Sequence, residues 1–287
     1  MMDKLLLQAL ESGDKDQILK ALKVNIPPKL YKYVWLDGSE KDKEKFDTLS
    51  NNQLWISRVS KFNDPFEFKG FYLNEQRFRE YKFSEDVIRT YKNIIDIKDT
   101  YGICCLSNAD LNNLPMWAYY TNNYEGFCIE YDVIKKDKIF EVLYEPRRIP
   151  IANILIQMGK DIYNVLPKDS SNLSSNDLER IFDEKEAELI NAGKYADILM
   201  QQLFIKSEQW SHEREFRIPY LLSKEDKNGK KVSISELGLK TSKVVCGFNC
   251  SEKARFTINS ISNKIGCGNA FQIKLSNTEY KIIETRI

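Results

Sequence analysis

The sequence predicts an α+β fold with a mixed, mainly antiparallel central sheet that is flanked by helices and carries a helical insertion at about residues 150–209. Two observations predict this class. Strand-like segments precede and follow a largely helical block without a regular strand–helix alternation, and several of them alternate apolar with polar residues. At 287 residues the chain can bury a sizeable core. We expect an N-terminal helical segment at 1–28 and a single α+β domain at 29–287 that contains the insertion.

The elements of the first half follow from periodicity and from turn residues. Leucines at helical spacing predict short helices within residues 3–24, and Pro27-Pro28 ends them and starts an extended segment. A nearly continuous apolar run predicts a strand that is buried on both faces at 101–106. In order, the further predictions are a strand at 30–34, a charged helix at about 39–50, a strand at 53–57, helical structure at 75–95, a short helix around 116–120 and an alternating strand at 127–132.

The second half begins with a strand at 138–144, and the helical block follows it. A polar break at 167–176 supplies possible N-caps within that block, Ser174 and Ser175. Ser251 and Glu252 predict a helix start, because serine caps helices and an acidic first turn suits the helix dipole. The remaining predictions are strands at 214–221, 243–248, 270–275 and 279–286, and a Lys/Gly/Asp-rich hairpin loop at 224–231.

Composition excludes several classes of function. The formal net charge is +1, from 43 basic and 42 acidic residues, which gives no global attraction to nucleic acid or to a membrane. No apolar run is long enough to span a bilayer, and the N-terminus lacks a signal-peptide pattern, so we expect a cytoplasmic protein. His212 is the only histidine, and the six cysteines lack paired zinc-ribbon spacing, so we expect no metal.

The first candidate site is the segment 62–68, in which phenylalanines bracket Asn63, Asp64, Pro65 and Glu67 just after a strand. The simpler interpretation is a turn, because Asn and Asp side chains bond to nearby backbone and proline fixes φ. The alternative interpretation is a ligand-contacting loop that uses the amide of Asn63 and the carboxylate of Asp64.

The second candidate is the segment 115–126. Trp117 and Tyr120 are three residues apart, so on a helix they share a face and could form a flat wall for a ring. Aromatic residues at this spacing also form ordinary core stripes. The polar residues Asn122, Asn123 and Glu125 lie close enough in sequence to keep both interpretations open.

The third candidate is the octet Trp210–Arg217. If it runs directly into a strand, Glu213, Glu215 and Arg217 project to one face while Arg214 and Phe216 face the other way. Such a cluster is either an ion-paired strand face or the wall of a site, because like charges oppose ionisation and opposite charges favour it.

Taken in order, these segments resemble a bacterial family, domain of unknown function 2971. The resemblance rests on Leu30–Tyr33, Leu54–Ser57 with Phe62–Glu67, Cys104–Ser107, Met116–Tyr120 with Gly126–Asp132, and Trp210–Arg217. It spans roughly residues 29–250. Tyr119 and Asn123 stand where the family often has histidines, which argues against a mechanism that uses those histidines.

A second resemblance concerns architecture. An early strand with Tyr31, a second strand ending in Ser57 and a late strand with Glu213 and Glu215 are similar to the layout of NAD-dependent ADP-ribosyltransferases. This resemblance implies NAD as substrate, Glu215 or Glu213 as the catalytic carboxylate, and a toxin or phage-defence effector. It further implies contacts to NAD from Tyr31, Ser57, Asn63, Asp64, Trp117, Tyr120 and Arg217, and a protein or nucleic-acid acceptor.

Two other functions stay open at this point. One is a non-catalytic regulatory module that binds a nucleotide, another small ligand or a partner through its aromatic segments. The other is a metal-dependent nuclease, which requires Asp64, Glu67, Glu213 and Glu215 to converge on one cation.

Overall fold

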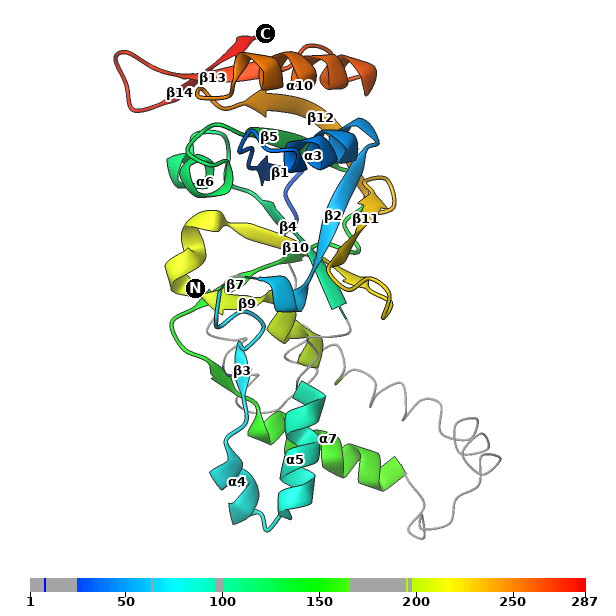
Figure 1. The fold of residues 1–287 in the computed structure, drawn as a ribbon. Helices are drawn as coiled ribbons and strands as arrows, with labels where there is room; N and C mark the ends of the chain where they lie inside the picture. The colour runs from blue at the N-terminus through cyan, green and yellow to red at the C-terminus, as the bar shows by residue number, and fades with distance from the viewer. Residues whose placement is uncertain (1–7, 9–24, 63, 96–100, 166–194, 196–197) are drawn as a thin grey trace. The chain divides into compact units, whose positions relative to one another are not determined.

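The computed structural model describes residue 8 and residues 25–62, 64–95, 101–165, 195 and 198–287. Its contacts divide the chain into two compact units, each assembled from separated segments (Figure 1). The first comprises Met1–Lys23, Asp64–Ile97 and Leu143–Glu208, and the second comprises Val24–Asn63, Lys98–Val142 and Gln209–Ile287. None of the described helices combines the length and apolarity needed to cross a bilayer.

The second unit is built on a ten-stranded sheet within the described residues. The strand order is β11-β2-β4-β1-β5-β12-β13-β14, and β10 pairs with both β4 and β6. Only β12 and β13 pair in parallel; the other pairs are antiparallel. The strands are β1 (Lys29–Val34), β2 (Gln53–Arg58), β4 (Tyr101–Ser107), β5 (Phe127–Val133), β6 (Phe140–Glu141), β10 (Glu215–Leu221), β11 (Gly229–Ser233), β12 (Leu239–Cys246), β13 (Phe271–Leu275) and β14 (Ile282–Arg286).

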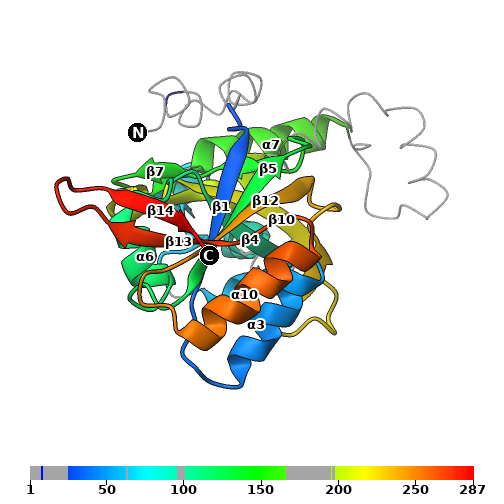
Figure 2. The ribbon, with the colours of Figure 1, turned by 90° about the horizontal axis from the view of Figure 1, so that it is seen from above.

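One face of this sheet carries the main apolar core. Alternate residues of the central strands point to it, including Leu30, Leu106 and Phe216, because side chains alternate between faces along a strand. Helices α3 (Lys41–Ser50) and α10 (Glu252–Lys264) lie side by side (Figure 2) and add Leu49 and Ile258 to this core. We call this surface the apolar face.

The opposite face carries a smaller core and most of the buried charge. Helix α6 (Leu114–Tyr120) contributes Trp117 to a cluster with Tyr33 and Cys128, which project from β1 and β5. Asn113 caps this helix, its side chain accepting a hydrogen bond from the backbone N–H of Met116. We call this surface the polar face. A 3-10 turn, η1 (Val59–Lys61), follows β2.

The first unit has its own core of aliphatic and aromatic side chains, including Phe71, Phe78 and Leu155. Two short parallel strand pairs accompany its helices, β3 with β8 and β7 with β9. Its elements are β3 (Phe71–Tyr72), α4 (Glu75–Glu80), α5 (Glu85–Ile95), β7 (Leu143–Glu145), β8 (Ile149–Pro150), α7 (Ala152–Val165), η2 (Gln201–Phe204) and β9 (Ile205–Ser207). The 3-10 helix η3 (Glu208–Glu213) leads from here into the second unit.

The structure confirms the α+β class and the mainly antiparallel central sheet, and most predicted elements lie where the sequence places them. The predicted helices within 3–24 and the polar break at 167–176 lie outside the described residues. Within the predicted helical insertion at 150–209, α7 is helical but β9 is a strand. The expectation that 29–287 is a single domain stays a prediction.

Three segments differ in detail from the predictions. The helical region at 75–95 is two helices, because Lys82 adopts a positive φ of 58° after α4 ends. The strand predicted at 138–144 divides at Val142, whose N–H donates to the carbonyl of Glu215 at 2.9 Å, so β6 and β7 join different sheets. The hairpin loop predicted at 224–231 ends earlier, since β11 begins at Gly229.

The octet Trp210–Arg217 does not run directly into a strand, so Glu213 does not share a strand face with Glu215 and Arg217; the strand predicted at 214–221 is β10. Residues through Glu213 belong to η3, and β10 begins at Glu215. Arg214 separates them with a φ of 44°, a left-handed conformation that strands do not contain. Glu215 and Arg217 therefore share a strand face as predicted, whereas Glu213 is placed by the 3-10 turn.

Candidate functional site

The candidate site lies on the polar face and starts from a row of side chains that crosses neighbouring strands. Ser107 at the end of β4 is directly opposite Tyr31 of β1 on one side and Glu215 of β10 on the other. Residues directly opposite each other in antiparallel strands project to the same face with Cβ atoms about 5 Å apart. We call Tyr31, Ser107 and Glu215 the cross-strand row.

Arg217 fixes the carboxylate of Glu215. Its Nε donates to Oε1 at 2.8 Å and its Nη2 donates to Oε2 at 3.0 Å. Arg217 is completely buried and Glu215 is 4% exposed, so this is an ion pair inside the protein. Paired charges can be buried because each satisfies the other's hydrogen-bonding groups, and the bidentate geometry also fixes orientation.

Glu213 is held beside the row by hydrogen bonds from two elements. The Ser107 hydroxyl donates to the backbone carbonyl of Glu213, and the Tyr120 hydroxyl on α6 donates to its carboxylate. Ser107 Oγ also accepts from the N–H of Ala109 at 2.9 Å. Glu213 is 4% exposed, so its carboxylate is partnered inside the protein. We call Ser107, Tyr120, Glu213, Glu215 and Arg217 the carboxylate cluster.

The charges of this cluster act on the phenol and thiol groups around it. Burial and the negative charge of Glu213 raise the pKa of Tyr120, and Glu215 adds to that effect. Burial and Glu215 raise the pKa of Cys105, which is directly opposite Arg217. Both groups are therefore neutral at pH 7, so Cys105 does not offer a thiolate nucleophile there.

The row continues past Tyr31 into a second group of charges. Tyr31 is directly opposite Glu130 of β5, which in turn is opposite Lys243 of β12. Glu130 is 7% exposed and accepts from Lys29 Nζ at 2.6 Å. Burial and the nearby charge of Glu130 raise the pKa of Tyr31 to about 12, so its half-buried hydroxyl stays protonated at pH 7.

Two other predicted site residues of the second unit, Ser57 and Trp117, do not join this row. Ser57 is paired with Ile103, four residues from Ser107 along β4. At about 3.3 Å per residue this corresponds to roughly 13 Å. Trp117 is fully buried, and its indole N–H donates to the carbonyl of Leu111 at 2.9 Å, so it forms part of the core. Its ring is not presented to solvent.

The segment 62–68 behaves as a turn where it is described. Asn63 lies outside the described residues. Asp64 belongs to the first unit, and its Oδ1 accepts from the N–H of Phe66 at 2.8 Å, which is the local bond of an Asx turn. Glu67 lies 3.7 Å from Lys206 Nζ within the same unit. Among the described residues, no group of three or more His, Cys, Asp or Glu side chains is placed to hold a metal ion.

Sequence reasoning missed Ser107 as a site residue. It ends the apolar run Tyr101–Leu106, and a polar residue at the end of such a run looks like an ordinary strand terminus. Ser107 is identified as a site residue by its position between Tyr31 and Glu215. That position follows from the pairing of the strands, which the sequence does not reveal.

Comparison with known proteins relates part of this site to a family. No curated protein and no solved structure gives a significant match to the chain. The family described as Protein of unknown function (DUF2971) matches residues 116–218, a range that includes Tyr120, Glu213, Glu215 and Arg217. The resemblance to this family is thereby confirmed for residues 116–218, which hold most of the carboxylate cluster.

Proposed function

We propose that this protein cleaves NAD and transfers its ADP-ribose to an acceptor, with the cross-strand row as the reaction site. The observation that carries the proposal is the register of three adjacent strands, which aligns Tyr31, Ser107 and Glu215 on the polar face. The positions of Tyr31 on the early strand β1 and of Glu215 on the late strand β10 support the proposal. In this proposal Ser107, which lies between Tyr31 and Glu215, replaces Ser57 at the middle position.

The chemistry requires a carboxylate at the reacting sugar. Cleavage breaks the bond between C1′ of the ribose and the nicotinamide nitrogen, and the bonding electron pair leaves with nicotinamide. The sugar passes through an oxocarbenium-like state, which a nearby negative charge stabilises. An acceptor hydroxyl, amine or water then bonds to C1′ and releases a proton. Glu215 provides the negative charge in this proposal.

The ion pair with Arg217 is compatible with that role. The rigid guanidinium fork holds the carboxylate in one orientation, which lowers the cost of positioning it in the transition state. Tyr31, with its half-buried ring beside Ser107, supplies an aromatic surface for nicotinamide.

Incubation of the full chain with NAD tests the proposal, with released nicotinamide measured by chromatography. We expect release by the wild-type protein and a loss of about 100-fold or more in Glu215→Gln. Glu252→Gln, at an exposed position at the start of α10, is the matched control and keeps wild-type activity.

Tyr31→Ala is a second test that leaves the buried ion pair intact. It lowers nicotinamide release while circular dichroism reports a folded protein. A wild-type protein that releases no nicotinamide, or a Glu215→Gln variant as active as wild type, overturns the proposal.

A second candidate function is ligand or partner binding without catalysis. The observation that favours it is Tyr119, which is 72% exposed and whose ring centroid lies 6.1 Å from that of His212. Exposed aromatic rings are common anchors of binding surfaces. If this function holds, Tyr119→Ala abolishes the biological effect in cells, whereas Glu215→Gln leaves it intact.

A further inference from the structure

A pocket of about 540 Å³ lies in the second unit, beside the core of the apolar face. Two of its lining residues, Ile234 and Leu239, belong to that core, whereas the cross-strand row projects to the polar face. Its volume is within the range of small-molecule sites. The pocket is therefore separate from the site proposed for NAD.

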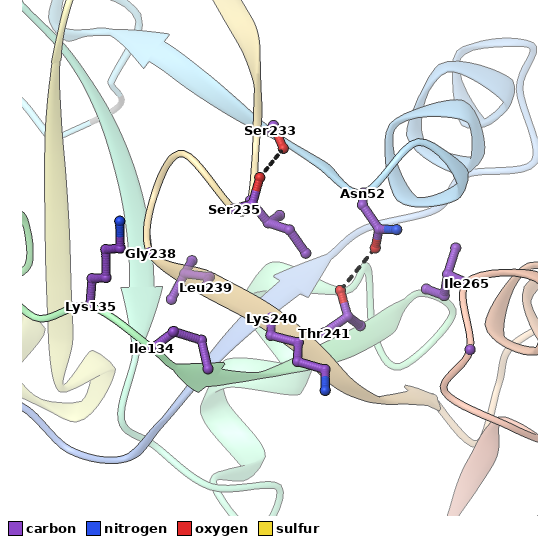
Figure 3. Close-up of a pocket in the computed structure, with 12 residues that line it drawn as sticks. Asn52, Ile134, Lys135, Ser233, Ser235, Gly238, Leu239, Lys240, Thr241 and Ile265 are labelled. Carbon is purple, nitrogen blue, oxygen red and sulfur yellow. Dashed lines mark hydrogen bonds between the residues drawn. The ribbon is translucent and has the colours of Figure 1, made fainter.

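The lining combines apolar surface with neutral polar groups. Ile134 and Ile265 contribute further apolar area, and Ile134 is 61% exposed. The hydroxyls of Ser233, Ser235 and Thr241 and the amide of Asn52 supply hydrogen-bonding groups (Figure 3). Thr241 donates to Asn52 at 3.3 Å, and the two serine hydroxyls lie 2.9 Å apart.

The only charged side chains that line the pocket in the described part of the chain are two lysines. Lys135 comes from the loop after β5 and Lys240 from β12, and Figure 3 shows them on different sides of Leu239. Neither forms an ion pair within the described residues, and both are exposed. Two ammonium groups without a lining carboxylate favour a negatively charged ligand.

Backbone hydrogen bonds hold the walls together. The N–H of Ile234 donates to the carbonyl of Asn52 at 3.0 Å, and the N–H groups of Ile134 and Lys135 both donate to the carbonyl of Gly238, at 2.8 and 3.0 Å. Gly238 has a φ of 74°, and a Cβ there would lie 2.8 Å from the Cβ of Lys135. Only glycine lets these two segments approach so closely, so this contact helps to define one wall of the pocket.

We propose that this pocket binds a phosphorylated small molecule with an apolar or aromatic body, such as a nucleoside diphosphate. The isoleucine and leucine side chains contact the body, the hydroxyls and the amide bind its polar edge, and Lys135 and Lys240 contact the phosphates. This assignment does not depend on the reaction proposed for the polar face.

Calorimetric titration of the full chain with ADP, adenosine and inorganic phosphate tests the proposal. We expect ADP to bind wild type more tightly than either fragment does. The double variant Lys135→Glu/Lys240→Glu weakens ADP binding by about tenfold or more, because it replaces two attractive contacts with repulsive ones. The matched control is Lys136→Glu/Lys253→Glu, which changes the net charge equally at exposed positions outside the pocket and keeps wild-type affinity.

Four results overturn the proposal. If ADP does not bind, or if it binds the lysine double variant as tightly as wild type, this pocket is not the binding site for ADP. If adenosine binds as tightly as ADP, the phosphates of the ligand do not contribute to binding. If inorganic phosphate binds as tightly as ADP, the apolar body of the ligand does not contribute. Glu215→Gln retains ADP affinity in this pocket, so failure of NAD cleavage and failure of this site are distinguishable.

Discussion

The two faces of the central sheet are made by the same strands and are stabilised in different ways. On β10, Phe216 and Ile218 enter the apolar face, whereas Glu215 and Arg217 enter the polar face. All four are nearly or fully buried, so burial alone does not distinguish structure from function here. The difference is that the apolar side chains need only good packing, whereas each buried charge depends on a specific partner.

The largest effect that tests this difference comes from removing Arg217. Arg217→Ala leaves the Glu215 carboxylate buried without its guanidinium, and we expect a loss of about 3–5 kcal/mol in the free energy of unfolding. Ile218→Val, the neighbouring change on the apolar face, costs about 0.5–1.5 kcal/mol. Urea denaturation of both variants measures the comparison.

The double variant Glu215→Gln/Arg217→Met is the control for this prediction. It removes both charges together, so it recovers part of the stability that Arg217→Ala loses. Equal losses in Arg217→Ala and Ile218→Val would show that the ion pair does not stabilise the polar face.

A smaller effect is expected at Tyr120. Tyr120→Phe removes the hydroxyl that donates to Glu213 but keeps the ring, so the buried carboxylate loses a hydrogen bond at nearly constant volume. The expected cost is about 1–3 kcal/mol, and thermal denaturation measures it. Tyr124→Phe on the same side of the sheet is the comparison, because its hydroxyl bonds at 3.2 Å to an exposed carbonyl. If Tyr120→Phe is as stable as Tyr124→Phe, the hydrogen bond from Tyr120 to Glu213 does not stabilise the fold.

The smallest expected effect is the contribution of Glu130 to the loss of stability in acid. Burial raises the pKa of its carboxyl, but the hydrogen bond from Lys29, the charge of Lys243 and the Ser242 hydroxyl together hold it below its usual value. A carboxyl whose folded-state pKa is lowered stabilises the protein above its unfolded pKa, and this contribution disappears as the pH falls through the folded value. Unfolding free energy of the wild type therefore falls on acidification more than that of Glu130→Gln.

Urea midpoints at pH 7 and at acidic pH measure that difference. Lys29→Met reduces this acid dependence of stability, because it removes one partner of Glu130. At pH 7 the substitution lowers the free energy of unfolding by only about 0.2–1 kcal/mol, because Lys29 is exposed. If the wild type and Glu130→Gln respond equally to acid, the ion pairs of Glu130 do not contribute to the pH dependence.

Local patterns were sufficient to predict most of the elements of both faces. Alternation predicted β5, the proline pair before Leu30 predicted the start of β1, and the helix start at Ser251 is correct, since its side chain accepts from the N–H of Ala254 at 3.3 Å. Alternation also predicted that Glu215 and Arg217 share a face. These features depend on residues within a few positions of one another, so they are visible in the sequence.

The site depended on information that local patterns do not contain. Tyr31, Ser107 and Glu215 are separated by many residues, and only the strand order brings them into one row. The left-handed conformation of Arg214, which moves Glu213 off the strand, is rare for a residue that is not glycine and has no sequence signature here. Ser57 was the natural choice for the middle position because its segment was the next predicted strand.

Nicotinamide release by two matched serine variants tests the central claim most directly. Ser107 lies in the cross-strand row. Ser57 lies on the same sheet, opposite Ile103, which is four residues before Ser107 on β4. Ser107→Ala and Ser57→Ala therefore each remove one serine hydroxyl, at two different positions. The proposed site predicts that Ser107→Ala lowers the rate of release from NAD by about tenfold or more, because Ser107 holds Glu213 beside Glu215. It predicts that Ser57→Ala leaves the rate unchanged; equal rates in the two variants would contradict it.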